Sequence, residues 1–95
     1  MKAEKKYVVA VNADEFGKKK EILFELNPRG SETLASPARG RSLGECYGNG
    51  KRVVMTKEQA EAVVEFVKTI EGIFSEPRIL TEKQLLARLA KRMHV

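Results

Sequence analysis

The first third of the chain has the short-period hydrophobic pattern that is typical of β-strands. Residues 7–11 contain three valines in five positions, and the run is too short for a helix. Residues 21–26 place an apolar side chain at every second position from Ile22, and they end at Asn27-Pro28, a dipeptide typical of turns. We therefore expect a first β-hairpin here.

The middle of the chain contains a second turn signal. Asn49-Gly50 supplies the two positive-φ positions of a type I′ turn, with candidate strands on either side at residues 43–47 and 51–55. Residues 27–40 are rich in Pro, Gly and Ser, and we expect them to form a long loop. This pattern predicts a second hairpin with Asn49-Gly50 at its tip.

The last part of the chain changes to helical periodicity. Apolar side chains recur at helical spacing over about 57–74 and again over 81–93, with Pro77 between the two segments. Both segments begin with a capping-box pattern, Thr56 with Gln59 and Thr81 with Gln84. The sequence therefore predicts two capped, amphipathic helices.

The predicted fold is one α+β domain over residues 1–95. Two hairpins within residues 5–56 give a small antiparallel sheet of three to four strands, and both helices pack on one of its faces. The apolar stripes of the helices should meet the apolar strand positions in one core, listed as Tyr7, Val9, Val11, Ile22, Phe24, Leu26, Val53, Met55, Val63, Val67, Ile70, Phe74, Leu85, Leu89 and Met93.

Composition narrows the class of protein. A chain of 95 residues that is 42% hydrophobic can form one modest core, which a homodimer interface could stabilise further. A single cysteine, Cys46, cannot form an internal disulfide or a metal cluster, and it fits a reducing, cytoplasmic location. The sequence contains no signal peptide and no run long enough to span a membrane, so no membrane partner is expected.

No catalytic constellation is recognisable. A Cys46 nucleophile would need a base, and the only histidine, His94, lies one residue from the end of the sequence. Cysteine is more often a small buried hydrophobe than a nucleophile. We therefore expect no enzyme activity, no cofactor and no metal.

The net charge of +5 is unevenly distributed. Residues 57–77 carry five acidic and two basic side chains, whereas residues 31–56 carry four basic and two acidic ones. The four basic residues are Arg39, Arg41, Lys51 and Arg52, and they lie among Gly, Pro and Ser. Because guanidinium groups suit phosphate and glycine permits close approach, these four residues are the predicted nucleic-acid-binding site.

Two other basic clusters have structural explanations. Residues 18–20 are three lysines, with Lys5 and Lys6 expected across the first hairpin, and they fit a solvated turn that protects a strand edge. Arg88, Lys91 and Arg92 end the last helix, where cations complement the helix dipole.

Residues 6–70 loosely resemble the single-stranded-DNA-binding transcriptional coactivator family related to the Whirly proteins. The similar segments are a Tyr-Val-Val strand at residues 6–11, a basic turn at 16–18, and a strand leading to a capped helix at 53–59. The resemblance implies nucleic-acid binding. It is a resemblance of pattern and assigns no family, because the aromatic residues of the family's DNA-facing sheet are mostly missing here.

Two functions follow from these observations. The first is a weakly sequence-specific nucleic-acid-binding module that uses the basic loop and hairpin, because phosphate contacts position a protein without reading sequence. The alternative is a protein–protein interaction or regulatory module, of the kind found as phage or plasmid inhibitors, that binds an acidic protein surface. Salt dependence of binding would separate the two.

Overall fold

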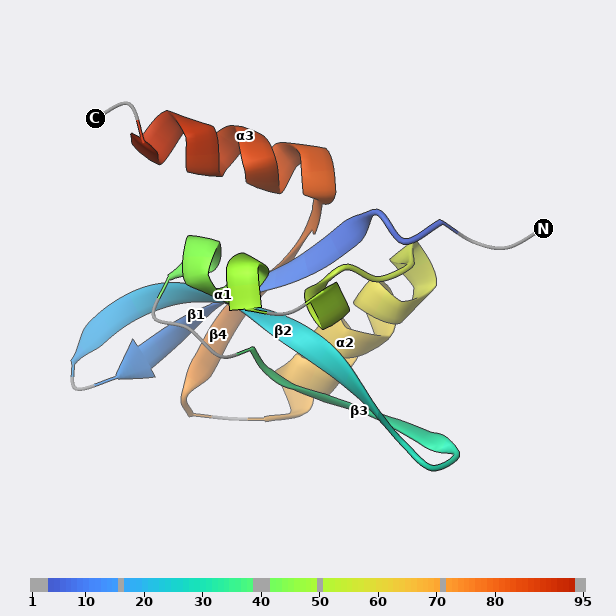
Figure 1. Cartoon of the computed structure of the whole chain (residues 1–95). Coiled ribbons are helices and arrows are strands. Elements are labelled where there is room, and N and C mark those ends of the chain that lie inside the picture. The colour runs from blue at the N-terminus through green and yellow to red at the C-terminus, as the bar shows by residue number, and fades with distance from the viewer. Residues whose placement is uncertain (1–3, 16, 39–41, 50, 71, 94–95) are drawn as a thin grey trace.

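A computed structural model describes residues 4–15, 17–38, 42–49, 51–70 and 72–93 (Figure 1). The fold is α+β, as predicted: a four-stranded antiparallel sheet with helices packed against it. The elements in chain order are β1 (Tyr7–Glu15), β2 (Lys18–Arg29), β3 (Glu32–Pro37), α1 (Leu43–Asn49), the 3-10 helix η1 (Lys51–Val53), α2 (Lys57–Thr69), β4 (Phe74–Thr81) and α3 (Glu82–Met93).

Strand β1 is the centre of the sheet and of the core. The strand order is β3-β2-β1-β4, so β1 pairs with β2 on one side and with β4 on the other. Val8, Val9, Ala10 and Val11 are each 0% exposed. Because successive side chains of a strand point to opposite faces, both faces of β1 must be covered.

The helices cover both faces of the sheet. On one face α2 contacts β4 and β1, and its Val63 lines a groove together with Leu26 of β2. On the other face α3 is bound to Glu21 through Arg88, and a Cβ on Gly44 of α1 would lie 3.7 Å from Leu89 of α3. Glu21 and Leu26 are separated by an odd number of residues, so they point to opposite faces of β2. The two long helices therefore do not share one face, because the doubly buried β1 needs a helix on each side.

The predicted helices and their caps are largely confirmed. Thr56 and Gln59 form a complete capping box at the start of α2. At the start of α3, the Gln84 N–H donates to Thr81 Oγ1 (3.0 Å), and the Thr81 N–H donates to Gln84 Oε1 (2.9 Å). However, α2 ends at Thr69 rather than at about residue 74.

The second hairpin is formed by a different part of the chain than predicted. Residues 43–49 are the helix α1, and the turn predicted at Asn49-Gly50 includes Gly50, which lies outside the described residues. Leu43, Cys46 and Tyr47 have helical spacing and pack inward together. The Glu45 N–H donates to Ser42 Oγ (3.3 Å), which caps the helix start. These interactions favour a helix over a strand.

The actual second hairpin replaces most of the predicted loop at residues 27–40. Strand β3 pairs with β2 from Arg29↔Glu32 to Phe24↔Pro37, with Gly30 and Ser31 as a two-residue loop. Gly30 has a φ of 62°, which a glycine adopts at little cost. The pairing gives the sheet one of its two outer strands.

The fourth strand is also outside the predicted range of residues 5–56. Strand β4 begins at Phe74, which was expected to end a helix, and pairs antiparallel with β1. Its register shifts between Ala10 and Asn12 of β1, and Glu76 nearby has a φ of 50°. This bulge accommodates Pro77, which cannot donate to a regular ladder.

No helix in the described ranges is long and apolar enough to cross a membrane.

The Gly30 turn yields a stability prediction. Gly30→Val should lower the free energy of unfolding by about 1–2 kcal/mol, because a β-branched residue is strained at positive φ. Gly48→Ala is the control. Gly48 does not have a positive φ, and no heavy atom lies within 4 Å of the Cβ that alanine would add. This substitution in α1 should therefore raise the free energy of unfolding by up to about 0.5–1 kcal/mol. Urea unfolding of both variants measures these changes, and a destabilising Gly48→Ala would contradict the helix.

Candidate functional site

The four residues of the predicted nucleic-acid site are described only in part. Arg39 and Arg41 lie outside the described residues, and of Lys51 only the backbone, at the start of η1, is described. Arg52 is exposed, and its guanidinium donates to Asn27 Oδ1 at 2.8 Å. The four-residue site therefore stays a prediction, and Arg52 is the one member whose side chain the structure describes.

A long-range backbone contact brings Arg52 close to Lys5. The N–H groups of Lys6 and Tyr7 both donate to the Met55 carbonyl (3.1 and 2.9 Å), and the Met55 N–H donates to the Tyr7 carbonyl (2.8 Å). These bonds fix the segment that follows η1 alongside the start of β1. Consequently Arg52 and Lys5 line the same surface hollow, although 47 residues separate them in the sequence.

This cationic hollow has a volume of about 320 Å³. Its other lining residues are Leu26, Pro28, Thr33, Val54 and Gln59. Among the side chains described there, two are cationic and none is a carboxylate. Guanidinium and ammonium groups favour an anionic group of a ligand.

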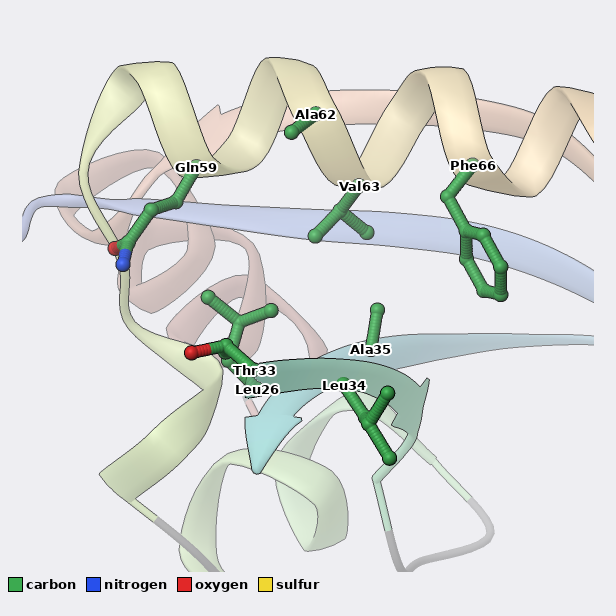
Figure 2. A pocket seen from close by; sticks show the side chains of 8 residues that line it. All are labelled: Leu26, Thr33, Leu34, Ala35, Gln59, Ala62, Val63 and Phe66. Carbon is green, nitrogen blue, oxygen red and sulfur yellow. The ribbon is translucent and has the colours of Figure 1, made fainter. Parts of the chain in front are cut away.

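An apolar groove of about 380 Å³ continues from the hollow, between β3 and α2 (Figure 2). Val63 and Phe66 point from α2 toward the strands, and Ala35 points from β3 toward the helix. The remaining lining residues are Leu26, Thr33, Leu34, Gln59 and Ala62. Phe66, which is 44% exposed, faces the groove, whereas Leu34, which is 48% exposed, points away from α2 at the edge of β3. Exposed apolar side chains that line a groove are typical of binding surfaces.

The groove and the hollow form one continuous depression. Leu26, Thr33 and Gln59 line both. Gln59 is held at the junction because its Oε1 accepts from the Thr56 N–H at 3.0 Å. A ligand in this depression would contact apolar side chains along most of its length and two cations at one end. Sequence reasoning missed Lys5 and the groove, since neither forms a local motif.

Lys5 and Lys6 were expected to lie across the first hairpin from the lysine triplet at residues 18–20, but they do not. The Cα partners of the triplet on β1 are Glu15, Asp14 and Ala13. The triplet therefore lies at the end of the β1–β2 hairpin, beside the turn.

A second polar cluster ties α3 to the sheet. Glu21, whose side chain is only 14% exposed, accepts hydrogen bonds from both Arg78 and Arg88, the latter at 3.1 Å. Arg78 also donates to Asn12 Oδ1 at 3.1 Å. Burial opposes ionisation of Glu21, but the hydrogen bond from Arg78 and the charge of Arg88 outweigh it and lower the Glu21 pKa. The cluster connects β1, β2, β4 and α3, which is a structural function.

Of the two residues considered for catalysis, His94 lies outside the described residues, and Cys46 is placed for packing next to Tyr47. Cys46 is fully buried, its thiol donates weakly to the Ala38 carbonyl (3.7 Å), and burial raises the thiol pKa. Tyr47 donates to Glu82 Oε2 (2.6 Å), and this hydrogen bond raises the Tyr47 pKa. A thiol that is buried and protonated is a poor nucleophile. The described part of the chain holds no group of three or more potential metal ligands.

Comparison of the chain with protein-family models, with curated proteins and with solved structures finds no match in any of the three.

The Glu21 cluster yields a pH prediction. Because folding lowers the Glu21 pKa from its ordinary 4.5, the cluster stabilises the fold fully above that value and loses this contribution as pH falls through the folded pKa. Glu21→Gln should therefore lower the free energy of unfolding by about 1–2 kcal/mol at pH 7 and by much less at pH 3. Urea unfolding at both pH values measures this difference. An equal cost at the two pH values would show that the carboxylate charge contributes nothing.

Proposed function

We propose that this protein is a non-catalytic interaction module that binds an acidic polypeptide segment in the depression between β3 and α2. One observation carries the proposal: an apolar groove runs directly into a hollow lined by Lys5 and Arg52 and by no described carboxylate. Apolar contact area supplies most of the affinity in such sites, and charge supplies orientation and specificity. A segment with apolar side chains and a carboxylate at one end is complementary to both parts.

Nucleic acid is the second candidate ligand. The net charge of +5 and the position of Arg52 in a cationic hollow favour it, and the hollow could hold a phosphate as well as a carboxylate. The apolar groove favours the polypeptide, because it offers Leu and Val side chains rather than further phosphate donors. Among the described residues that line the groove, Phe66 is the single aromatic one, whereas single-stranded nucleic acids are usually held by several stacked aromatics.

Charge reversal at the hollow tests the proposal. Phage-displayed random heptapeptides are panned against the wild type and against a Lys5→Glu, Arg52→Glu double variant. The wild type should enrich sequences that combine apolar and acidic residues, and the double variant should reduce their recovery on the order of tenfold, because it places like charges at the carboxylate position.

The matched control is Lys83→Glu with Lys91→Glu, which makes the same change in net charge at two exposed lysines on α3. This control should enrich the same sequences as the wild type. Fluorescence anisotropy with labelled single-stranded and duplex oligonucleotides at two salt concentrations runs in parallel. If the wild type enriches no peptide but binds oligonucleotides, and alanine at Arg39, Arg41, Lys51 and Arg52 abolishes that binding, the nucleic-acid function replaces the one proposed.

A further inference from the structure

The outer edge of β3 has two residues whose backbone groups point away from the sheet. The Ala38 N–H donates to the Leu23 carbonyl (2.9 Å), which makes the pair Leu23–Ala38 a hydrogen-bonded one. Such pairs alternate with non-bonded pairs along an antiparallel ladder. Two of the non-bonded pairs along this register are Leu26↔Ala35 and Pro28↔Thr33. The N–H and C=O groups of Thr33 and Ala35 therefore point outward, away from β2.

The proline positions agree with this alternation. Pro28 and Pro37 lack an N–H, and both fall in pairs that the alternation leaves non-bonded, where no ladder bond is lost. Pro37, at the C-terminal end of β3, therefore offers no outward-facing N–H donor. The accessible edge is thus short and is centred on Thr33 and Ala35.

The same two residues line the depression. Thr33 and Ala35 lie on the side of β3 that faces α2, and Ala35 visibly points toward the helix (Figure 2). Both side chains are small, so they leave space beneath Phe66. A strand added to this edge would lie directly beside the groove, and its alternate side chains would reach into it.

The two edges of the sheet differ in their protection. Proteins usually protect edge strands with prolines, bulges or charges. Strand β4 has both a register shift and Pro77 within it. Strand β3 has Glu32 beside the turn and Pro37 at its other end, but no proline, bulge or charge between Thr33 and Ala35. An edge of this kind is a template for pairing with another chain.

We infer that the bound segment adds to β3 as a fifth strand of the sheet, with its backbone bonded to Thr33 and Ala35, apolar side chains in the groove and a carboxylate at Lys5 and Arg52. This inference rests on the proposed function and specifies how the segment binds. Strand addition supplies affinity through main-chain hydrogen bonds and leaves specificity to the side-chain pockets, as in other peptide-binding sheets.

A second copy of the chain is a poorer occupant of this edge. In a two-fold antiparallel pairing of two β3 strands, Ala35 of one copy would face Thr33 of the other. Neither Ala35 nor its neighbours Ser36 and Pro37 has a carboxylate to offer the cationic hollow. An acidic segment of another protein complements both the edge and the charge.

Substitution at Ala35 tests the inference. Ala35→Pro removes the outward N–H without removing a bond to β2, and Ala35→Ser is the control because it keeps the N–H and nearly the same volume. Both variants are panned with the same heptapeptide library. Ala35→Ser should enrich the same peptides as the wild type, and Ala35→Pro should recover on the order of tenfold fewer phage that carry those peptides. Equal enrichment by wild type and Ala35→Pro would overturn strand addition while leaving the proposed function standing, whereas no enrichment by the wild type would overturn both.

Hydrogen exchange on the wild type gives a second readout that does not depend on folding of the proline variant. In the free protein the amides of Leu34 and Ser36 should exchange slowly and those of Thr33 and Ala35 rapidly. With the most enriched heptapeptide at saturation, the Thr33 and Ala35 amides should become protected. If those two amides are already protected in the free protein and it sediments as a dimer, the occupant is a second copy and the inference is wrong.

Discussion

The burial of β1 on both faces is the constraint on which the rest of the fold depends. Residues 8–11 are apolar without interruption and fully buried, so a sheet with one open face would expose either Val8 and Ala10 or Val9 and Val11. Burying a valine contributes roughly 1.5–3 kcal/mol, a large fraction of the stability of a domain this small. The chain therefore places a strand on each side of β1 and a helix on each of its faces.

Much of this fold could be predicted from local chemistry. The two threonine–glutamine capping boxes start α2 and α3 where the sequence indicated, because their hydrogen bonds lie within four residues. The second hairpin was placed wrongly because two dipeptides compete as turns. Asn49-Gly50 has the stronger intrinsic preference, but Leu43, Cys46 and Tyr47 before it have helical spacing. Gly30-Ser31 lies between two segments that can pair as strands. The flanking sequence therefore decides which of the two dipeptides forms the hairpin turn.

The remaining elements depend on interactions that no short window of sequence contains. Strand β4 has a proline and a residue at positive φ, both of which lower its intrinsic strand preference, and pairing with the buried β1 overrides them. The cationic hollow requires the backbone bonds between Tyr7 and Met55, which join residues far apart in the chain. Arg52 could be named from its residue type, but its neighbour Lys5 could not.

The position of the candidate site follows from the number of helices that cover each face of the sheet. A helix with its side chains is about 10–12 Å wide and strands are about 4.8 Å apart, so one helix covers roughly two strands. One face has two helices, α3 over β4 and β1 and α1 against β2. The other face has only α2, which contacts β4 and β1. The β2–β3 half of that face is left without a helix, which is why Phe66 of α2 remains exposed beside it. The groove is thus the region that this topology leaves open, and a strand added at β3 would lie beside it and extend its alternate side chains into it.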